Sequence, residues 1–272
     1  MYILSTALTA IFDIILRPFS SLSPIWGLLA ISFVSGILMV IIFKHTSNQK
    51  AIRAAKDKIG AYLLEIRLFK DDVGLMLNAQ KRILRTNLTY LRYSVIPMLI
   101  MLAPVVLILA QLGIRYENRP LKPGESVLVK MKFADPIEGL SVAVEPTDGL
   151  RLETPLLHIP DEREVDVRVK AITEGTHQLT ISYGGQQTSM PIVVSNQLEK
   201  TYGERKKADF SGFLFSPGQK PLPKDSSLES INIILPEREL SLFGLNMHWL
   251  LIFFIVSVVA GYSLKGVFKV EV

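Results

Sequence analysis

Three long runs without a charged residue limit what this chain can fold into more than any other feature. They cover residues 25–43, 94–114 and 247–264, and the third contains one titratable group, His248. Each reaches the roughly 17–25 residues that a helix needs to cross a hydrocarbon core of ~30 Å. Backbone amides inside lipid must bond internally, so such runs have to be helical. The sequence therefore predicts an α-helical membrane protein with three transmembrane helices.

The distribution of Lys and Arg predicts the orientation of these helices. Segment 44–93 carries 11 Lys and Arg against 4 Asp and Glu, whereas segment 115–246 carries 16 against 19. Cationic residues close to the spans favour the cytosolic side. Segment 44–93, together with Lys265 and Lys269 after the third span, is therefore predicted to be cytosolic, although Arg115 and Arg119 oppose this. We expect a multi-pass protein of the inner (plasma) membrane, with the N-terminus outside and the C-terminus in the cytosol.

The net charge of +5 and the pI near 9.3 come from these juxtamembrane cations and do not predict DNA binding. Such cations attract anionic lipid head groups or ribosomal RNA, or they simply form a solvated face. The residues predicted to contact ribosome or lipid are Lys50, Arg53, Lys56, Lys58, Arg67, Lys81, Arg82 and Arg85. The chain has no cysteine, so its own core must hold any extracytoplasmic domain.

Segment 1–24 precedes the first span and is apolar apart from Asp13 and Arg17. Its apolar residues recur at helical spacing, and Pro18 and Pro24 bracket a Ser-rich turn. We interpret it as an amphipathic helix in the outer interface of the membrane. A signal peptide cut near Ala7 or Ala10 is the alternative, but its usual basic first region is missing.

Segment 44–93 has the pattern of a helical, coiled-coil-like region. Its heptad of apolar residues is interrupted by Asp71, Asp72 and Gly74. An antiparallel hairpin turning near residues 70–74 is favoured over one long helix with a weak point, because the chain must return to the same membrane face. The apolar positions are Ile52, Ala55, Ile59, Tyr62, Ile66, Phe69, Val73, Met76 and Ile83.

Segment 115–195 changes to short alternating or β-branched runs separated by turn signals. The runs cover residues 126–133, 140–144, 151–157, 164–171, 177–183 and 188–194. This spacing predicts an inserted all-β, immunoglobulin-like sandwich on the extracytoplasmic side. In the fourth run, Glu164, Asp166 and Arg168 are predicted to face water. Segment 196–246 is predicted to be a linker, flexible over 203–226, with one further strand at 230–235.

The sequence gives little sign of an enzyme, a metal or a cofactor. The histidines His45, His158, His177 and His248 are scattered, and no pair has the spacing of metal ligands. No nucleophile-elbow, phosphate-loop or dinucleotide-binding sequence is present. We therefore expect a protein that binds and positions other molecules without a covalent step.

Polar and small residues within the spans suggest an intramembrane groove. Pro97 and Pro104 each remove a backbone hydrogen bond from the second span, which predicts a bend or an opening. Hydroxyl and methionine side chains would suit a surface that accepts varied apolar segments, although such residues also mediate ordinary helix contacts. The predicted groove residues are Ser32, Ser35, Met39, Pro97, Met101, Pro104 and Gln111.

The order of these parts resembles the core of the YidC-type membrane protein insertases, including their three-span relatives in archaea and the endoplasmic reticulum. The local motifs are residues 26–27 at the start of the first span, 36–39 before Lys44, 46–50 before the basic helix, and the paired prolines in 96–100 and 103–105. The resemblance covers about residues 1–115 and 245–272. It implies a hydrated groove that receives nascent membrane proteins, and a hairpin that contacts the ribosome.

Two features depart from that family. Ser35 occupies the position where the bacterial insertase carries a groove arginine, and the β-domain lies between the second and third spans. The first hypothesis is an insertase-like protein or membrane chaperone with nascent membrane proteins as clients. The alternative is an envelope scaffold whose β-domain binds an envelope protein, and a weaker third is a signalling protein with a dimeric coiled coil.

Overall fold

The computed structural model describes residues 2–19, 22–209, 212, 214, 216–242, 244–268 and 270. The chain divides into two compact units. The β unit comprises Met1–Leu28 and Leu107–Trp249, and the helical unit comprises Leu29–Val106 and Leu250–Val272. Lys269, which the orientation argument used, and Ser20 and Ser21 of the predicted Ser-rich turn lie outside the described residues.

The β unit begins with helix α1 (Tyr2–Leu16), followed by the 3-10 turn η1 (Arg17–Phe19). The buried side of α1 carries hydroxyl groups, and its exposed side is apolar. The side that packs against the unit buries Ser5, Thr9, Phe12 and Leu16, two of which carry hydroxyls. The outward side exposes the isoleucines Ile3, Ile11, Ile14 and Ile15. An outward apolar side of this kind is typical of a helix that contacts lipid.

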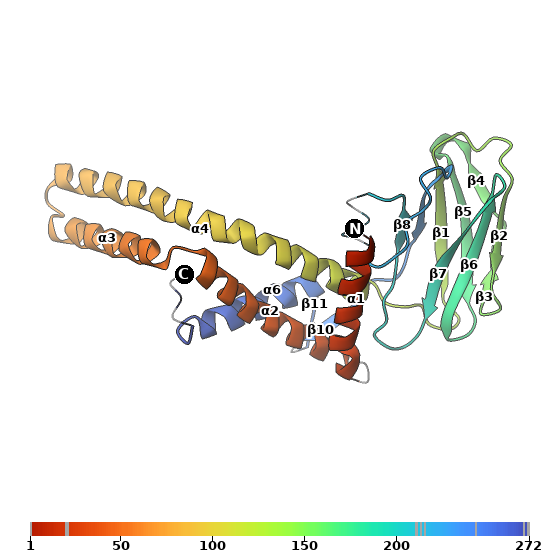
Figure 1. The fold of residues 1–272 in the computed structure, drawn as a ribbon, viewed down its shortest axis with the longest axis horizontal. Coiled ribbons are helices and arrows are strands. Elements are labelled where there is room, and N and C mark those ends of the chain that lie inside the picture. Colours follow the sequence, from red (N-terminus) through yellow and green to blue (C-terminus); the bar gives the residue numbers. More distant parts are fainter. Residues whose placement is uncertain are drawn as a thin grey trace. The chain divides into compact units, whose positions relative to one another are not determined.

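Two antiparallel sheets form most of the β unit (Figure 1). The first has the order β3-β5-β1-β9-β8, with β4 also paired to β5. The second has the order β2-β6-β7. The strand bounds are β1 Ser126–Phe133, β2 Val142–Pro146, β3 Leu150–Leu152, β4 Leu157–Ile159, β5 Glu164–Ala171, β6 Gly175–Tyr183, β7 Gln186–Val194, β8 Glu204–Lys206 and β9 Leu228–Ile233. A 3-10 turn, η2 (Pro160–Glu162), precedes β5.

One hydrophobic core holds the two sheets together as a sandwich-like arrangement. Alternate residues of β1 and β5 point into it, and Val129 lies opposite Val167 in their shared register. Residues of β6 and β7 such as Ile181 and Ile192 belong to the same core. The period-two alternation of these strands is therefore explained by one buried face in each sheet.

Two predictions about this domain need correction. Asp166 does not face water: its side chain is buried on β5, between Lys130 of β1 and Leu157 of β4 in the strand register, and its Oδ1 has no hydrogen-bond partner among the described residues. The domain also does not end at residue 195, because β9 pairs with β1 and β8 pairs with β9. Part of the predicted linker is thus structural. A small hairpin of β10 (Leu240–Leu242) and β11 (Leu245–Met247) follows.

Three helices build most of the helical unit: α2 (Pro24–Thr46), α3 (Gln49–Leu68) and α4 (Val73–Tyr116). The side chain of Asn48 caps α3, and that of Asp72 accepts a hydrogen bond from the amide of Leu75 in the first turn of α4. The two helices lie side by side (Figure 1). Arg82 of α4 binds Glu65 of α3 at 3.0 Å and also lies over the ring of Tyr62.

Helix α4 continues through both of its prolines without interruption. The helix therefore has no break at Pro97 or Pro104, where the sequence predicted an opening.

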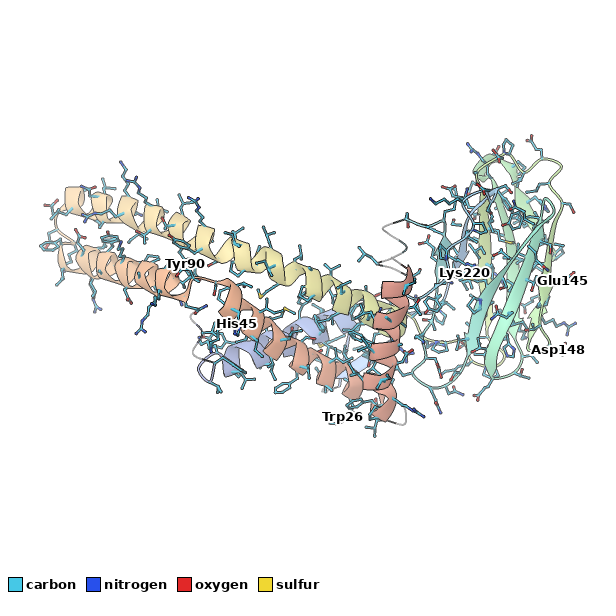
Figure 2. All side chains as sticks on the ribbon, viewed as in Figure 1. Trp26, His45, Tyr90, Glu145, Asp148 and Lys220 are labelled. Carbon is cyan, nitrogen blue, oxygen red and sulfur yellow. The ribbon has the colours of Figure 1, made fainter. Side chains whose placement is uncertain are left out.

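The side of α4 that faces α3 includes Tyr90 (Figure 2). The interruption at Asp71 and Asp72 instead forms the turn of a helical hairpin between Leu68 and Val73.

Two helices, α2 and α4, are long and apolar enough to cross a membrane. The third predicted span is shorter than expected. Helix α6 (Trp249–Leu264) has 16 residues, because Met247 belongs to β11 and pairs with Leu240. At 1.5 Å per residue, α6 is about 24 Å long. The described structure thus has two full-length candidate spans and one shorter apolar helix, where three spans were predicted.

Candidate functional site

Six of the seven predicted groove residues lie in the helical unit, and Gln111 lies in the β unit. Ser32 and Ser35 are buried one turn apart on α2, and Pro97 is buried on α4. Met39, Met101 and Pro104 are half-buried. None of the seven lines the cavity around Gln219 or the one between Leu140 and Gln186, both in the β unit. The structure therefore does not gather them into one described cavity.

Close helix contact is the clearest feature of α2. A Cβ atom on Gly36 would overlap the carbonyl oxygen of Ser257 and lie 3.0 Å from the Cβ of Ala260, both on α6. A Cβ atom on Gly261 of α6 would lie 3.3 Å from Val40. Small residues let two helices approach in this way when lipid supplies no hydrophobic driving force. The packing of α2 against α6 places Ser32 and Ser35 one turn or less from this contact.

Gln111 belongs to a buried polar cluster that joins α1 to the end of α4. Its Nε2 donates to Thr9 Oγ1 at 3.1 Å, and its Oε1 accepts from Arg115 Nη1 at 3.1 Å. Arg115 is 3% exposed and also binds Asp13 at 2.5 Å. Lys200, which follows β7, binds the other oxygen of Asp13 at 2.6 Å. Gln111 is thus occupied within the protein and is not available to line a groove.

The electrostatics of Asp13 favour its charged form. Partial burial of the carboxyl raises its pKa, but hydrogen bonds and charges from Lys200 and Arg115 outweigh this effect. The net result is a pKa below the ordinary value of 3.8. Asp13 therefore stays ionised and ties α1 to two segments far away in the sequence.

The sequence analysis does not predict this cluster. There, Arg115 is only a cation that opposes the predicted orientation, and Asp13 is only a charged residue within an apolar segment. The available signal was the spacing of Gln111 and Arg115, which share one face of a helix, together with an acid at residue 13. Nothing in the local pattern pointed to Lys200.

A second polar site lies next to the cluster. Tyr116 and Arg238 influence each other electrostatically, and burial lowers the pKa of the Arg238 guanidinium. Among the described residues, the Tyr116 hydroxyl and two guanidinium nitrogens of Arg238 are buried without a hydrogen-bond partner. The neighbouring Gly27 has no room for a Cβ atom, which would lie 2.8 Å from the Tyr116 hydroxyl. This region is tightly packed.

The predicted ribosome or lipid contacts lie on α3 and the first part of α4. Lys56 and Arg82 are half-buried, and Arg82 is engaged with Glu65. The other six are exposed: Lys50, Arg53, Lys58, Arg67, Lys81 and Arg85. These six are placed where a large external partner could reach them.

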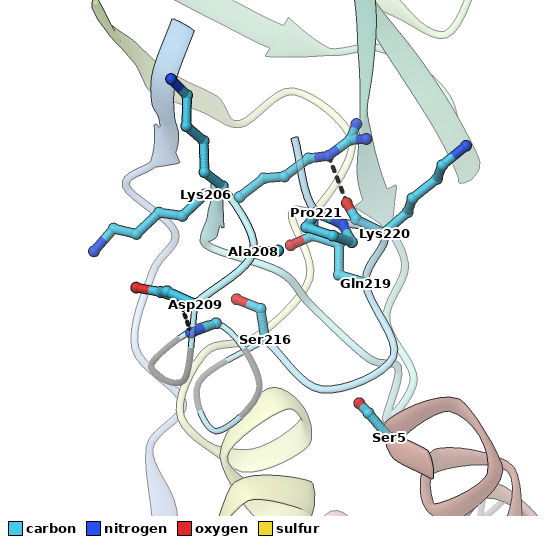
Figure 3. A pocket seen from close by; sticks show the side chains of 11 residues that line it. Ser5, Lys206, Ala208, Asp209, Ser216, Gln219, Lys220 and Pro221 are labelled. Atoms are coloured by element: carbon cyan, nitrogen blue, oxygen red, sulfur yellow. Dashed lines mark hydrogen bonds between the residues drawn. The ribbon is translucent and has the colours of Figure 1, made fainter. Parts of the chain in front are cut away.

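A small cavity in the β unit is rich in basic residues (Figure 3). Lys206 and Lys220 extend away from it, so their ammonium groups do not converge on its centre. Gln219 lines the cavity, and its buried Oε1 has no hydrogen-bond partner among the residues that the structure describes. No group of three acidic or histidine side chains suited to a metal ion occurs among the described residues.

A scan of protein-family models and a search of curated proteins find no match to this chain. The function must therefore be argued from the sequence and from the geometry above.

Proposed function

We propose that this chain is an insertase-like membrane protein, with α2, α4 and α6 as its spans, that helps apolar segments enter the bilayer. The observation that carries this proposal is the continuity of α4. Its first part is basic and pairs with α3, whereas its second part is long and apolar enough to span a membrane. One continuous helix would thus run from the cytosol into the interior of the bilayer.

The length of α4 supports this role. A helix of 44 residues is about 66 Å long, and a hydrocarbon core takes up about 30 Å of it. The hairpin would therefore project by about 35 Å from the core on the cytosolic side. Its six exposed cations would meet ribosomal RNA or lipid phosphates there.

The shortness of α6 suggests how such a protein would lower the barrier to insertion. A helix of about 24 Å is shorter than the average core, and a bilayer adapts to such a mismatch by thinning locally. A thinner core shortens the path over which polar groups of a client lack water. Ser32 and Ser35 are buried within four residues of Gly36, which contacts α6, and their hydroxyls would add polar character to this region.

Crosslinking during translation tests the proposal. A photoreactive residue at Met39 or Met101, both half-buried in the helical unit, should form adducts with nascent membrane proteins. In reconstituted vesicles, Ser35→Leu should lower insertion of a test protein because it removes a buried hydroxyl. Absence of nascent-chain adducts at both methionines would overturn the proposal.

The envelope-scaffold alternative is distinguished by deleting the β-sandwich. Asn118 and Glu237 form an antiparallel bridge, so the two ends of the domain are adjacent and a short linker can replace residues 119–236. This deletion removes Lys200 but retains α1 and the ion pair between Asp13 and the buried Arg115, so the remaining cluster keeps its charges balanced. An insertase core should retain its insertion activity, whereas a scaffold that binds an envelope protein should lose its function.

A further inference from the structure

An exposed apolar stripe runs along α4 from the predicted span into the hairpin. Leu84, Leu88 and Leu91 of the hairpin are 63%, 67% and 50% exposed. The stripe continues on the same helix face through Val95, Met98 and Leu102, all exposed. The spacing of three or four residues places these side chains in one continuous row. Leu77, two helical turns before Leu84, is also exposed and extends the row toward the turn of the hairpin.

Lipid cannot cover the whole stripe if α4 spans the bilayer. Leu84 lies ten residues before the start of the apolar run at residue 94, which is about 15 Å along the helix axis. Leu77 lies about 26 Å from the same point. Because α4 is uninterrupted, these leucines leave the membrane together with the helix. Exposed leucines in water call for a protein partner.

The charges along the stripe select the kind of partner. Helix α4 contains no Asp or Glu, and Lys81, Arg85 and Arg92 accompany the leucines. Two copies of α4 packed along this face would bring cations next to cations, which disfavours a homodimer. An apolar helix flanked by acidic residues would instead bury the leucines and meet opposite charge.

We propose that the α4 stripe is a docking track for the apolar segment of a nascent membrane protein with an acidic flank. The inference rests on the proposed function and adds the substrate class and the path of entry. The client helix would bind the hairpin leucines first, with its carboxylates near Lys81, Arg85 and Arg92. It would then follow the unbroken row through Val95 and Met98 into the bilayer.

Photocrosslinking from the full-length protein tests this track. A benzoyl-phenylalanine is placed at Leu84 or Leu88, and at Thr89 as an exposed control on another side of α4. Ribosome-bound clients carry one apolar segment flanked by either Asp and Glu or Lys. We expect adducts from Leu84 and Leu88 with the acidic-flanked client, and few from Thr89 or with the Lys-flanked client. Adducts with a second copy, with lipid or with no molecule would overturn the inference.

A functional variant separates this inference from the proposed function. The double substitution Leu84→Gln and Leu88→Gln should lower insertion of the acidic-flanked client about tenfold, because two exposed leucines lose their apolar contact. Thr89→Gln should leave insertion unchanged. Probes at Met39 and Met101 are read in parallel. Client adducts there, with none at Leu84 or Leu88 and normal insertion by the double variant, would refute the track and leave the insertase proposal standing.

Discussion

Two aspartates of this protein respond to burial in opposite ways. Asp13 has two cationic partners, which hold its pKa below the ordinary value despite its partial burial. For Asp166, burial is the largest effect and raises the pKa, with a further increase from Glu164 that Lys130 only partly opposes. At the residue scale, neighbouring charges therefore decide whether a buried carboxylate stabilises the fold.

Replacing Asp13 by Asn should destabilise the β unit by about 1 kcal/mol at neutral pH, because Arg115 loses its ionic partner while Asp13 itself is partly exposed. A lowered folded-state pKa gives stability that is present above the unfolded-state pKa and is lost as the pH falls through the folded-state pKa. The difference between wild type and Asp13→Asn should thus shrink below about pH 4. Thermal unfolding followed by the fluorescence of Trp26 and Trp249, both in the β unit, measures it.

Replacing Asp166 by Asn should have the opposite effect, a stabilisation of about 1 kcal/mol at pH 7, because burial and Glu164 disfavour the charged carboxylate more than Lys130, 3.8 Å away, favours it. A raised folded-state pKa gives stability that is present below the unfolded-state pKa and is lost as the pH rises through the folded-state pKa. The advantage of the variant should therefore disappear in acid. The exposed Asp161→Asn is the matched control for both aspartates, and equal behaviour of Asp161 and Asp166 variants would contradict this account.

At the scale of elements, strands and helices with a strong period were predictable, and contacts between distant segments were not. Alternation in the sequence gave the bounds of β1 and β5, since both lie over one core. The place of β9 beside β1 depends on a pairing across about 100 residues, which no local pattern encodes. The start of α6 at Trp249, two residues after the predicted start of the span, likewise depends on the pairing of Met247 with Leu240.

In the candidate site, too, local features were predictable and contacts between distant segments were not. Ser32 and Ser35 were recognisable as polar residues in an apolar helix, but their burial depends on the tertiary packing of the helical unit. The ion pair between Asp13 and Lys200 joins residues 187 positions apart, and the residue spacing in neither segment predicts it. The burial of Asp166 was not predictable because alternation alone cannot tell which strands pair with β5, where β1 lies on one side and β4 on the other.

The α2–α6 contact gives a prediction about elements. Gly36→Ala should destabilise the helical unit by about 2 kcal/mol, because the new methyl group would overlap the backbone of Ser257. Gly60→Ala on α3 meets open space and should stabilise its helix by about 0.5–1 kcal/mol. Hydrogen exchange of the amides in segment 250–264 reports the first effect. Unchanged exchange in Gly36→Ala would show that α2 and α6 do not depend on this contact.

At the scale of the whole molecule, the proposed orientation of the chain in the membrane can be tested directly. The chain has no cysteine, so single cysteines provide clean labels. Asp148→Cys lies on the exposed edge of the β-domain near Glu145 (Figure 2), and Gly60→Cys lies on the exposed side of α3. In intact spheroplasts, a membrane-impermeant maleimide should label Asp148→Cys and should label Gly60→Cys only after lysis. The reverse pattern would invert the proposed orientation.

The ionic tie between Asp13 and Lys200 also has a consequence for biogenesis. Lys200 is synthesised 187 residues after Asp13. At about 5–20 residues per second, that interval lasts roughly 10–40 s. Arg115 is made 102 residues after Asp13 and can bind it before Lys200 is available. The ionic cluster is complete only after β1 to β7 have been made, so α1 gains its last charged partner after the strands that precede Lys200.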